Sequence, residues 1–115
     1  MAEDTQNVRP YGYRNPRIAC PLTLHLEVTS AGEAEAIAVR GIDISAGGVA
    51  IAVGDDVELA ETVELSIRCG EDELGRIPGQ VFYQSRDHYG LEFKFETDEQ
   101  RQQMQDFIAQ FIHTI

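Results

Sequence analysis

The chain has 115 residues, enough for one domain, and 43% of them are hydrophobic, which allows a single packed core. Its formal net charge of −11 argues against nonspecific binding to nucleic acids or anionic membranes, because both need a basic face. No apolar run reaches the roughly 18 residues of a membrane span, and the N-terminus lacks the apolar segment of a signal peptide. We therefore expect a cytoplasmic protein without membrane insertion.

The N-terminal segment differs from the rest of the chain. Residues 1–12 are polar, have no periodicity and contain Pro10 and Gly12, so they are expected to form a flexible arm ahead of one domain at 13–115. Segment 5–26 has no acidic residue but holds three of the nine basic ones: Arg9, Arg14 and Arg17. This local basic patch either balances charge in solvent or binds an anion.

Apolar and polar residues alternate in six short segments, as is typical of half-buried β-strands. The segments are 20–28, 37–44, 49–53, 63–69, 77–83 and 91–95. Glycine-containing turns are expected between them at 30–33, 54–56, 70–73 and 86–90. Pro78 indicates that the fifth strand is an edge or contains a bulge. Because closure hides the edges of so small a sheet, the pattern predicts an all-β barrel or sandwich.

The second and third segments carry the most unusual local features. The apolar positions of the second segment change parity at Gly41, which indicates a β-bulge. We expect this bulge to turn Asp43 and Ser45 outward together. In the third segment the outward positions are only Ala50 and Ala52, so this face is open to a ligand or a neighbour.

The last segment has helical periodicity. Thr97 followed by Gln100 is typical of a capping box, and an apolar stripe runs along residues 98–115. The polar face has only Arg101 as a cation, which favours packing on the barrel over membrane binding; a partner-binding helix is the alternative. The predicted core comprises Ile37, Val39, Val49, Ile51, Leu65, Ile67, Val81, Phe93 and Phe95, with Phe107 and Phe111 of the helix covering an open end or side.

The sequence offers little for catalysis or metal binding. Cys20 and Cys69 lie on apolar positions and are expected to be free, buried thiols. A serine nucleophile elbow needs glycine two residues before Ser45, where Asp43 stands, and there is no phosphate-binding loop. The histidines lack metal-ligand spacing; they are His25, His88 and His113. We expect neither an enzyme nor a metal or other cofactor.

A polar cluster and the arginines remain to be explained. An arginine fork can meet a phosphate or the N7 and O6 acceptors of guanine, and a carboxylate such as Asp43 can accept from guanine N1 and N2. The Ser45 hydroxyl and the backbone at Gly47 and Gly48 could complete a phosphate or base contact. This set fits an anionic guanine nucleotide. The alternative is that these residues only shape the turn.

The order of these features resembles the PilZ domain family from Tyr13 onward. The features are an arginine-containing arm, a strand, DxSxxG at 43–48, GQVFYQSRDHYGLEFKF at 79–95 and a C-terminal helix. The resemblance implies a six-stranded Greek-key barrel with a C-terminal helix. For many members it also implies non-catalytic binding of cyclic di-GMP, through an RxxxR motif in the N-terminal loop and a [D/N]xSxxG motif on the barrel.

The second motif is complete here, but the first is not. With Arg17 as the second arginine of RxxxR, Tyr13 stands at the first position, Arg14 lies one place late and Arg9 lies four residues before Tyr13. The resemblance therefore leaves two hypotheses: a receptor whose arm orders on cyclic di-GMP and changes a contact with a downstream protein, or a protein-interaction adaptor with a degenerate nucleotide site. The candidate ligand-binding residues are Arg9, Tyr13, Arg14, Arg17, Asp43, Ser45, Gly47 and Gly48.

Overall fold

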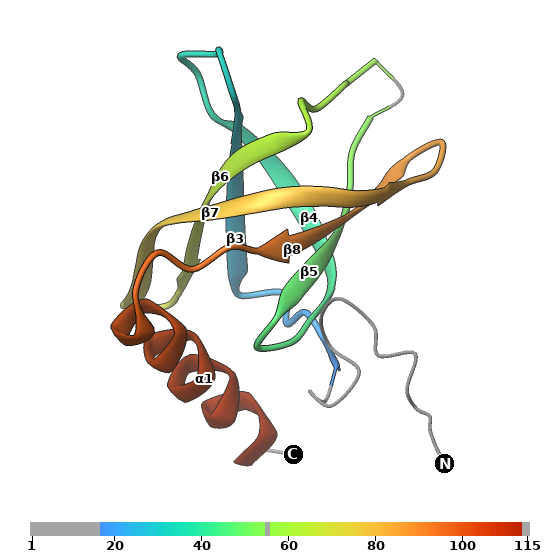
Figure 1. The fold of residues 1–115 in the computed structure, drawn as a ribbon. Coiled ribbons are helices and arrows are strands. Elements are labelled where there is room, and N and C mark those ends of the chain that lie inside the picture. Colours follow the sequence, from blue (N-terminus) through green and yellow to red (C-terminus); the bar gives the residue numbers. More distant parts are fainter. Residues whose placement is uncertain (1–16, 55, 114–115) are drawn as a thin grey trace, which may run out of the picture.

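The computed structural model describes residues 17–54 and 56–113, which form an antiparallel barrel with one helix (Figure 1). The elements are β2 (Ile18–Ala19), β3 (Leu24–Ser30), β4 (Ile37–Ile44), β5 (Gly48–Ala52), β6 (Thr62–Cys69), β7 (Asp72–Gln84), β8 (His88–Phe93) and α1 (Asp98–His113).

Six strands close the barrel in the order β3, β6, β7, β8, β5 and β4, and β4 pairs back with β3. All neighbours are antiparallel. Strands β3, β4 and β5 follow one another, and β6 then returns to lie beside β3, which is a Greek key. The six-stranded barrel with a C-terminal helix is thus confirmed.

The short strand β2 is an addition that the sequence did not predict. It pairs with the end of β4, with Ile18 opposite Ile44. The continuous strand expected over 20–28 is wrong, because β3 starts only at Leu24. Pro21 lacks the N–H that a strand ladder needs, and its carbonyl instead accepts a turn hydrogen bond from the Leu24 N–H at 3.0 Å. Leu22 lies on this turn and is 99% exposed, although the alternation over 20–28 placed it on the apolar side of the expected strand.

The predicted bulge at Gly41 is confirmed. The register between β4 and β5 shifts between Gly41 and Asp43. A Cβ atom at position 41 would lie 2.6 Å from Cys20 Sγ and 2.8 Å from a Leu26 methyl group, closer than real contacts allow. Glycine therefore lets β4 pass under the β2–β3 connection at this point.

Strand β7 is longer than the sequence indicated. It begins at Asp72, after a two-residue turn in which Gly70 has a positive φ of 63°, so the turn expected to run to residue 73 is shorter. Pro78 is not on an edge, since β7 lies between β6 and β8. The irregularity it suggested lies nearby, where the pairing with β6 shifts between Ile77 and Leu74. Strand β8 likewise begins at His88, within the expected turn.

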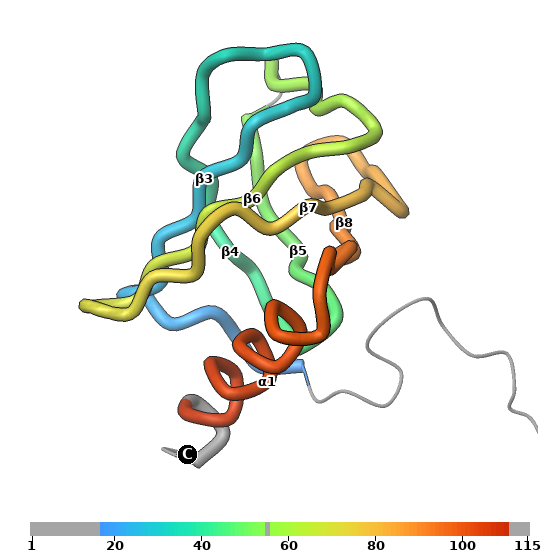
Figure 2. The backbone as a smooth tube through the Cα atoms, turned by 60° about the vertical axis from the view of Figure 1, so that its left-hand side comes forward, coloured from blue at the N-terminus to red at the C-terminus, as the bar shows by residue number. Residues whose placement is uncertain are grey.

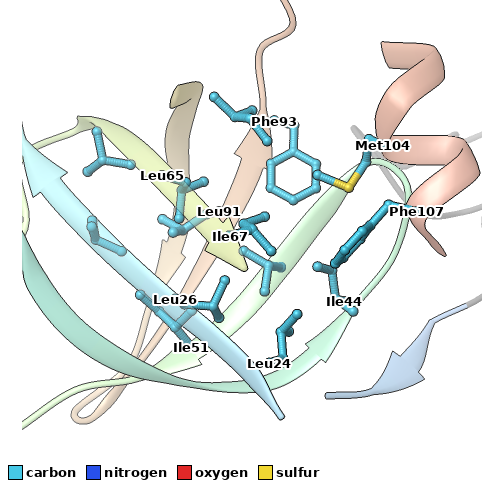
Figure 3. Packing of buried hydrophobic residues seen from close by; sticks show 14 of the residues in the cluster. Leu24, Leu26, Ile44, Ile51, Leu65, Ile67, Leu91, Phe93, Met104 and Phe107 are labelled. Atoms are coloured by element: carbon cyan, nitrogen blue, oxygen red, sulfur yellow. The ribbon is translucent and has the colours of Figure 1, made fainter. Parts of the chain in front are cut away.

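The core fills the barrel and continues to the helix (Figure 3). Six predicted core residues are buried: Val49, Ile51, Leu65, Ile67, Phe93 and Phe107. Four others are only partly buried and pack against this cluster: Ile37, Val39, Val81 and Phe95. The Phe111 side chain lies outside the described residues. Tyr89 was missed: it is buried because its hydroxyl accepts from the Leu59 N–H at 3.2 Å and from Gln84 Nε2 at 3.1 Å.

Helix α1 lies across one end of the barrel (Figures 1 and 2), as predicted. It buries Met104, Phe107 and Ile108, and Figure 3 shows Met104 beside Phe93. The capping interaction is also present: the Gln100 N–H donates to Thr97 Oγ1 at 3.0 Å, and Gln100 Oε1 accepts from the backbone N–H of residue 96 at 2.9 Å. Gln100 Nε2 also donates to the carbonyl of residue 76, which ties the helix start to β7.

Within the described residues, no helix combines the length and apolar character that crossing a membrane requires.

Candidate functional site

A row of small residues crosses the outer surface of the barrel. Asp43 on β4 is paired with Ala19 on β2 and with Ala50 on β5, and Ala50 is paired with Gly90 on β8. Val49 and Ile51 are fully buried, so strand alternation places Ala50 and Ala52 on the opposite side of β5. The expectation that this face is open is wrong at Ala50, which is only 6% exposed, and Gly90 is buried too, whereas Ala52 is half-buried. We call the surface formed by Asp43, Ala50, Ala52 and Gly90 the small-residue face.

An aromatic pair borders this face on the β7 side. Tyr83 is paired with Gly90, and a Cβ atom at position 90 would lie 2.2 Å from the Tyr83 ring. Phe82 meets Tyr83 edge to face, with ring centroids 5.1 Å apart, and both rings are partly exposed. Glycine at 90 thus lets an aromatic ring lie against the strand, next to the alanine positions.

An ion pair borders the face on the β2 side. Arg17 Nε donates to Asp43 Oδ1 at 2.9 Å, and a terminal guanidinium nitrogen of Arg17 contacts the same oxygen. About a third of each side chain is exposed. The structure therefore brings together two predicted site residues that lie 26 positions apart in the chain. Both of these Arg17 contacts are to the same carboxylate oxygen of Asp43, Oδ1.

The predicted outward orientation of Ser45 is wrong. Ser45 is fully buried in the turn between β4 and β5, where its Oγ accepts from the Gly47 N–H at 3.1 Å and its N–H donates to the Gly48 carbonyl at 2.9 Å. The bulge at Gly41 turns Asp43 outward, but β4 ends at Ile44, so strand alternation no longer applies to Ser45. Gly47 is tied to the barrel as well, since its carbonyl accepts from the Phe93 N–H at 2.9 Å. Ser45 thus shapes the turn that follows Asp43.

We expect Ser45→Ala to lower the free energy of unfolding by about 1–3 kcal/mol, because it leaves the part-buried Gly47 N–H without its acceptor. Urea titration would measure this loss, and Ser85→Ala, at an exposed turn position, is the control with an expected change within about 0.5 kcal/mol. Equal stabilities of the two variants would contradict the structural role of the Ser45 hydroxyl.

Cys20 lies next to the ion pair but is unsuited to thiolate chemistry. Burial raises the pKa of its thiol to about 12, the negative charge of Asp43 adds to the rise, and Arg17 opposes it. The thiol therefore stays protonated in neutral solution. Cys20 and Cys69 are both free, as predicted, although each is half-buried rather than fully buried. In the described ranges, no three His, Cys, Asp or Glu side chains are grouped so that they could hold a metal ion.

Three predicted site residues, Arg9, Tyr13 and Arg14, lie outside the described residues. The DxSxxG motif at 43–48 spans the end of β4, the turn and the first residue of β5. Of its residues, Asp43 lies on the outer surface, whereas Ser45 and Gly48 are buried.

The sequence profile of the PilZ domain family matches residues 12–110. The chain belongs to this family. No curated protein matches the sequence. Among solved structures, the fold is similar to YcgR from Escherichia coli in complex with c-di-GMP, with a TM-score of 0.70 and 18% identity over 88% of this chain and 46% of that one.

Two further PilZ-like structures have the same fold. One is the PilZ domain of CeSA from a cellulose-synthesizing bacterium, with a TM-score of 0.65 and 20% identity over 85% of this chain and 99% of that chain. The other is the inhibitor of motility MotI/DgrA from Bacillus subtilis, with a TM-score of 0.63 and 19% identity over 89% of this chain and 52% of that chain. This PilZ domain thus spans about half the length of YcgR and of MotI/DgrA.

Proposed function

We propose that this PilZ domain is a non-catalytic cytoplasmic receptor for cyclic di-GMP that signals through contact with a downstream protein. The observation that supports the proposal is the Arg17–Asp43 pair at the edge of the small-residue face. It brings together a guanidinium just before β2 and a carboxylate on β4, the two groups that recognise an anionic guanine nucleotide.

The chemistry of binding follows from these groups. Asp43 Oδ2 accepts from the N1 and N2 donors of a guanine base, while Arg17 turns its fork to a phosphate or to guanine N7 and O6. Ala52 is half-buried and has no side chain long enough to obstruct a flat ring that lies against β5 at this position. Ser45 contributes indirectly, because its turn fixes the end of β4 and so the position of Asp43.

Binding must also open the existing ion pair in part. A solvent-exposed ion pair contributes only about 0–1 kcal/mol, so its loss costs little compared with the new contacts to a charged ligand. In this proposal the N-terminal arm then orders over the nucleotide, with Tyr13, Arg14 and Arg9 as further contacts, and the changed surface alters affinity for the partner protein.

Isothermal titration calorimetry of the purified protein with cyclic di-GMP tests the proposal, with GTP and cyclic di-AMP as controls. We expect heat of binding with cyclic di-GMP and affinities at least about 10-fold weaker for the controls, because cyclic di-AMP lacks the N1 and N2 donors that Asp43 accepts from and GTP has one guanine base where cyclic di-GMP has two. Absence of binding at millimolar cyclic di-GMP would overturn the receptor proposal.

A second candidate function is an adaptor that works through protein contacts alone. Tyr13, at the first arginine position of the RxxxR motif, is the observation that favours it. The same titration separates the two candidates, since an adaptor with a degenerate site gives no heat with any of the three nucleotides.

A further inference from the structure

We propose that Arg40 supplies the cation that the incomplete N-terminal motif lacks, by binding a phosphate of the nucleotide held at Arg17 and Asp43. The inference rests on the proposed receptor function and adds to it a binding residue from β4, outside both sequence motifs. It follows from the strand register, from the charges around Arg40 and from a cavity that Arg40 lines.

The register places Arg40 beside Asp43 on the outer surface. Arg40 is paired with Ala52 and Asp43 with Ala50, and these alanines are two residues apart on the outer side of β5. Two residues of a strand span about 7 Å, well within the reach of an arginine side chain. In a regular strand, residues 40 and 43 would face opposite sides. The bulge after Gly41 adds the extra residue that brings both to the same side.

Arg40 is an exposed cation that no carboxylate of the described residues neutralises. The neighbouring polar side chains do have partners. Asp43 forms an ion pair with Arg17, and His88, which lies opposite Ala52 on β8, has its Nδ1 3.0 Å from Asp87 Oδ1. Arg17 and Asp43 offset each other, so Arg40 leaves one positive charge without a carboxylate partner among these three side chains, in a chain of net charge −11. This positive charge attracts an anionic ligand to Arg40 more strongly than to the acidic parts of the surface.

Arg40 also lines a cavity of about 570 Å³, which Asp43 and Arg17 do not line. Gly41 and Ile42 line it from β4, Cys20 and Leu22 from the β2–β3 connection, and His88 from β8. This volume is in the usual range for small-molecule sites, roughly 300–1,000 Å³. The cavity adjoins the ion pair through β4, because Gly41 and Ile42 directly precede Asp43. A nucleotide with its guanine at Asp43 thus has room to extend a phosphate toward the Arg40 guanidinium.

Calorimetric titration with cyclic di-GMP tests this assignment in Arg40→Gln, Arg40→Lys and the control Arg68→Gln. Arg68 is also an exposed strand arginine, but it lies on β6, with β3 between it and Arg40, and does not line the cavity. We expect Arg40→Gln to weaken binding about 10-fold or more, and Arg40→Lys to keep part of the affinity as a point charge without the fork. Arg68→Gln should stay within about twofold of the parent, because β3 lies between β6 and β4 and salt screens exposed charges two strand spacings, about 10 Å, apart.

Salt dependence and melting temperature complete the test. The ratio between parent and Arg40→Gln affinities should shrink as salt is added, while the melting temperatures agree, because the lost contact is a screened charge pair. If the parent binds and Arg40→Gln binds as tightly as Arg68→Gln, the Arg40 assignment is overturned and the receptor proposal stands. If the parent does not bind at millimolar ligand, the receptor proposal itself fails and the assignment fails with it.

Discussion

Leu26→Ala is expected to lower the free energy of unfolding by about 2–5 kcal/mol, whereas Leu22→Ala should change it by less than about 0.5 kcal/mol. The two leucines are four residues apart and have the same parity in the sequence, yet Leu26 is 2% exposed and Leu22 is 99% exposed. Leu26 lies in the barrel core, where a lost side chain leaves a cavity (Figure 3).

Urea denaturation of the two variants measures this difference directly. The substitution is chemically identical in both variants, so the same atoms are removed at the two positions. Equal losses at the two positions would mean that the chain between β2 and β3 continues as a strand, contrary to the turn at Pro21.

Asp43→Ala is expected to weaken cyclic di-GMP binding about 100-fold or more, with little change in melting temperature. The carboxylate is proposed to accept two hydrogen bonds from guanine, each worth roughly 1.5–3 kcal/mol when one partner is charged. The folded state loses only a part-exposed ion pair with Arg17, which contributes about 0–1 kcal/mol. Asp43→Asn should keep more affinity than Asp43→Ala, because the amide carbonyl still accepts a hydrogen bond.

Asp72→Ala is the matched control for this loss. Asp72 is an exposed acid at the start of β7. Removing any acid from a chain of net charge −11 favours an anionic ligand slightly, so Asp72→Ala should bind as well as the parent or better. A loss of affinity in Asp43→Ala therefore cannot come from the change in net charge, which by itself favours binding of the anionic ligand. Calorimetry that finds the same affinity in both variants would contradict a role for Asp43 in guanine recognition.

The sequence predicted those parts of the fold that depend on local signals. Strand alternation indicated the six barrel strands, and the parity change at Gly41 located the bulge. Thr97 and Gln100 marked the start of the helix, because a capping box involves only residues close in sequence. Each of these signals can be read within a window of a few residues.

The errors concern features that depend on distant partners. Leu22 has the parity of a core residue, but Pro21 ends the pairing there, and β2 forms only because β4 offers a partner. Tyr89 appeared to belong to a turn, although its hydroxyl is satisfied inside the barrel by the Leu59 N–H, 30 residues away in the chain. Ser45 fits a binding motif, yet its hydroxyl is used by its own turn.

The candidate site was predicted in its residue types but not in its geometry. A guanidinium and a carboxylate were both expected from the motifs, whereas the contact between Arg17 and Asp43 depends on the pairing of β2 with β4. The position of Arg40 beside Asp43 depends on the register with β5. Neither pairing can be derived from alternation alone, because a register shift of two residues leaves the pattern unchanged.

The measurement that tests the central proposal most directly is a titration of the ¹⁵N-labelled protein with cyclic di-GMP, followed through its amide chemical shifts. We predict that the amides of Asp43, Ala50 and Gly90 shift together, since they lie in one cross-strand row. The amides of Ser66 and Glu73, on β6 and β7, should stay unchanged. Amide shifts confined to α1, or none at millimolar ligand, would contradict a cyclic di-GMP site on the small-residue face.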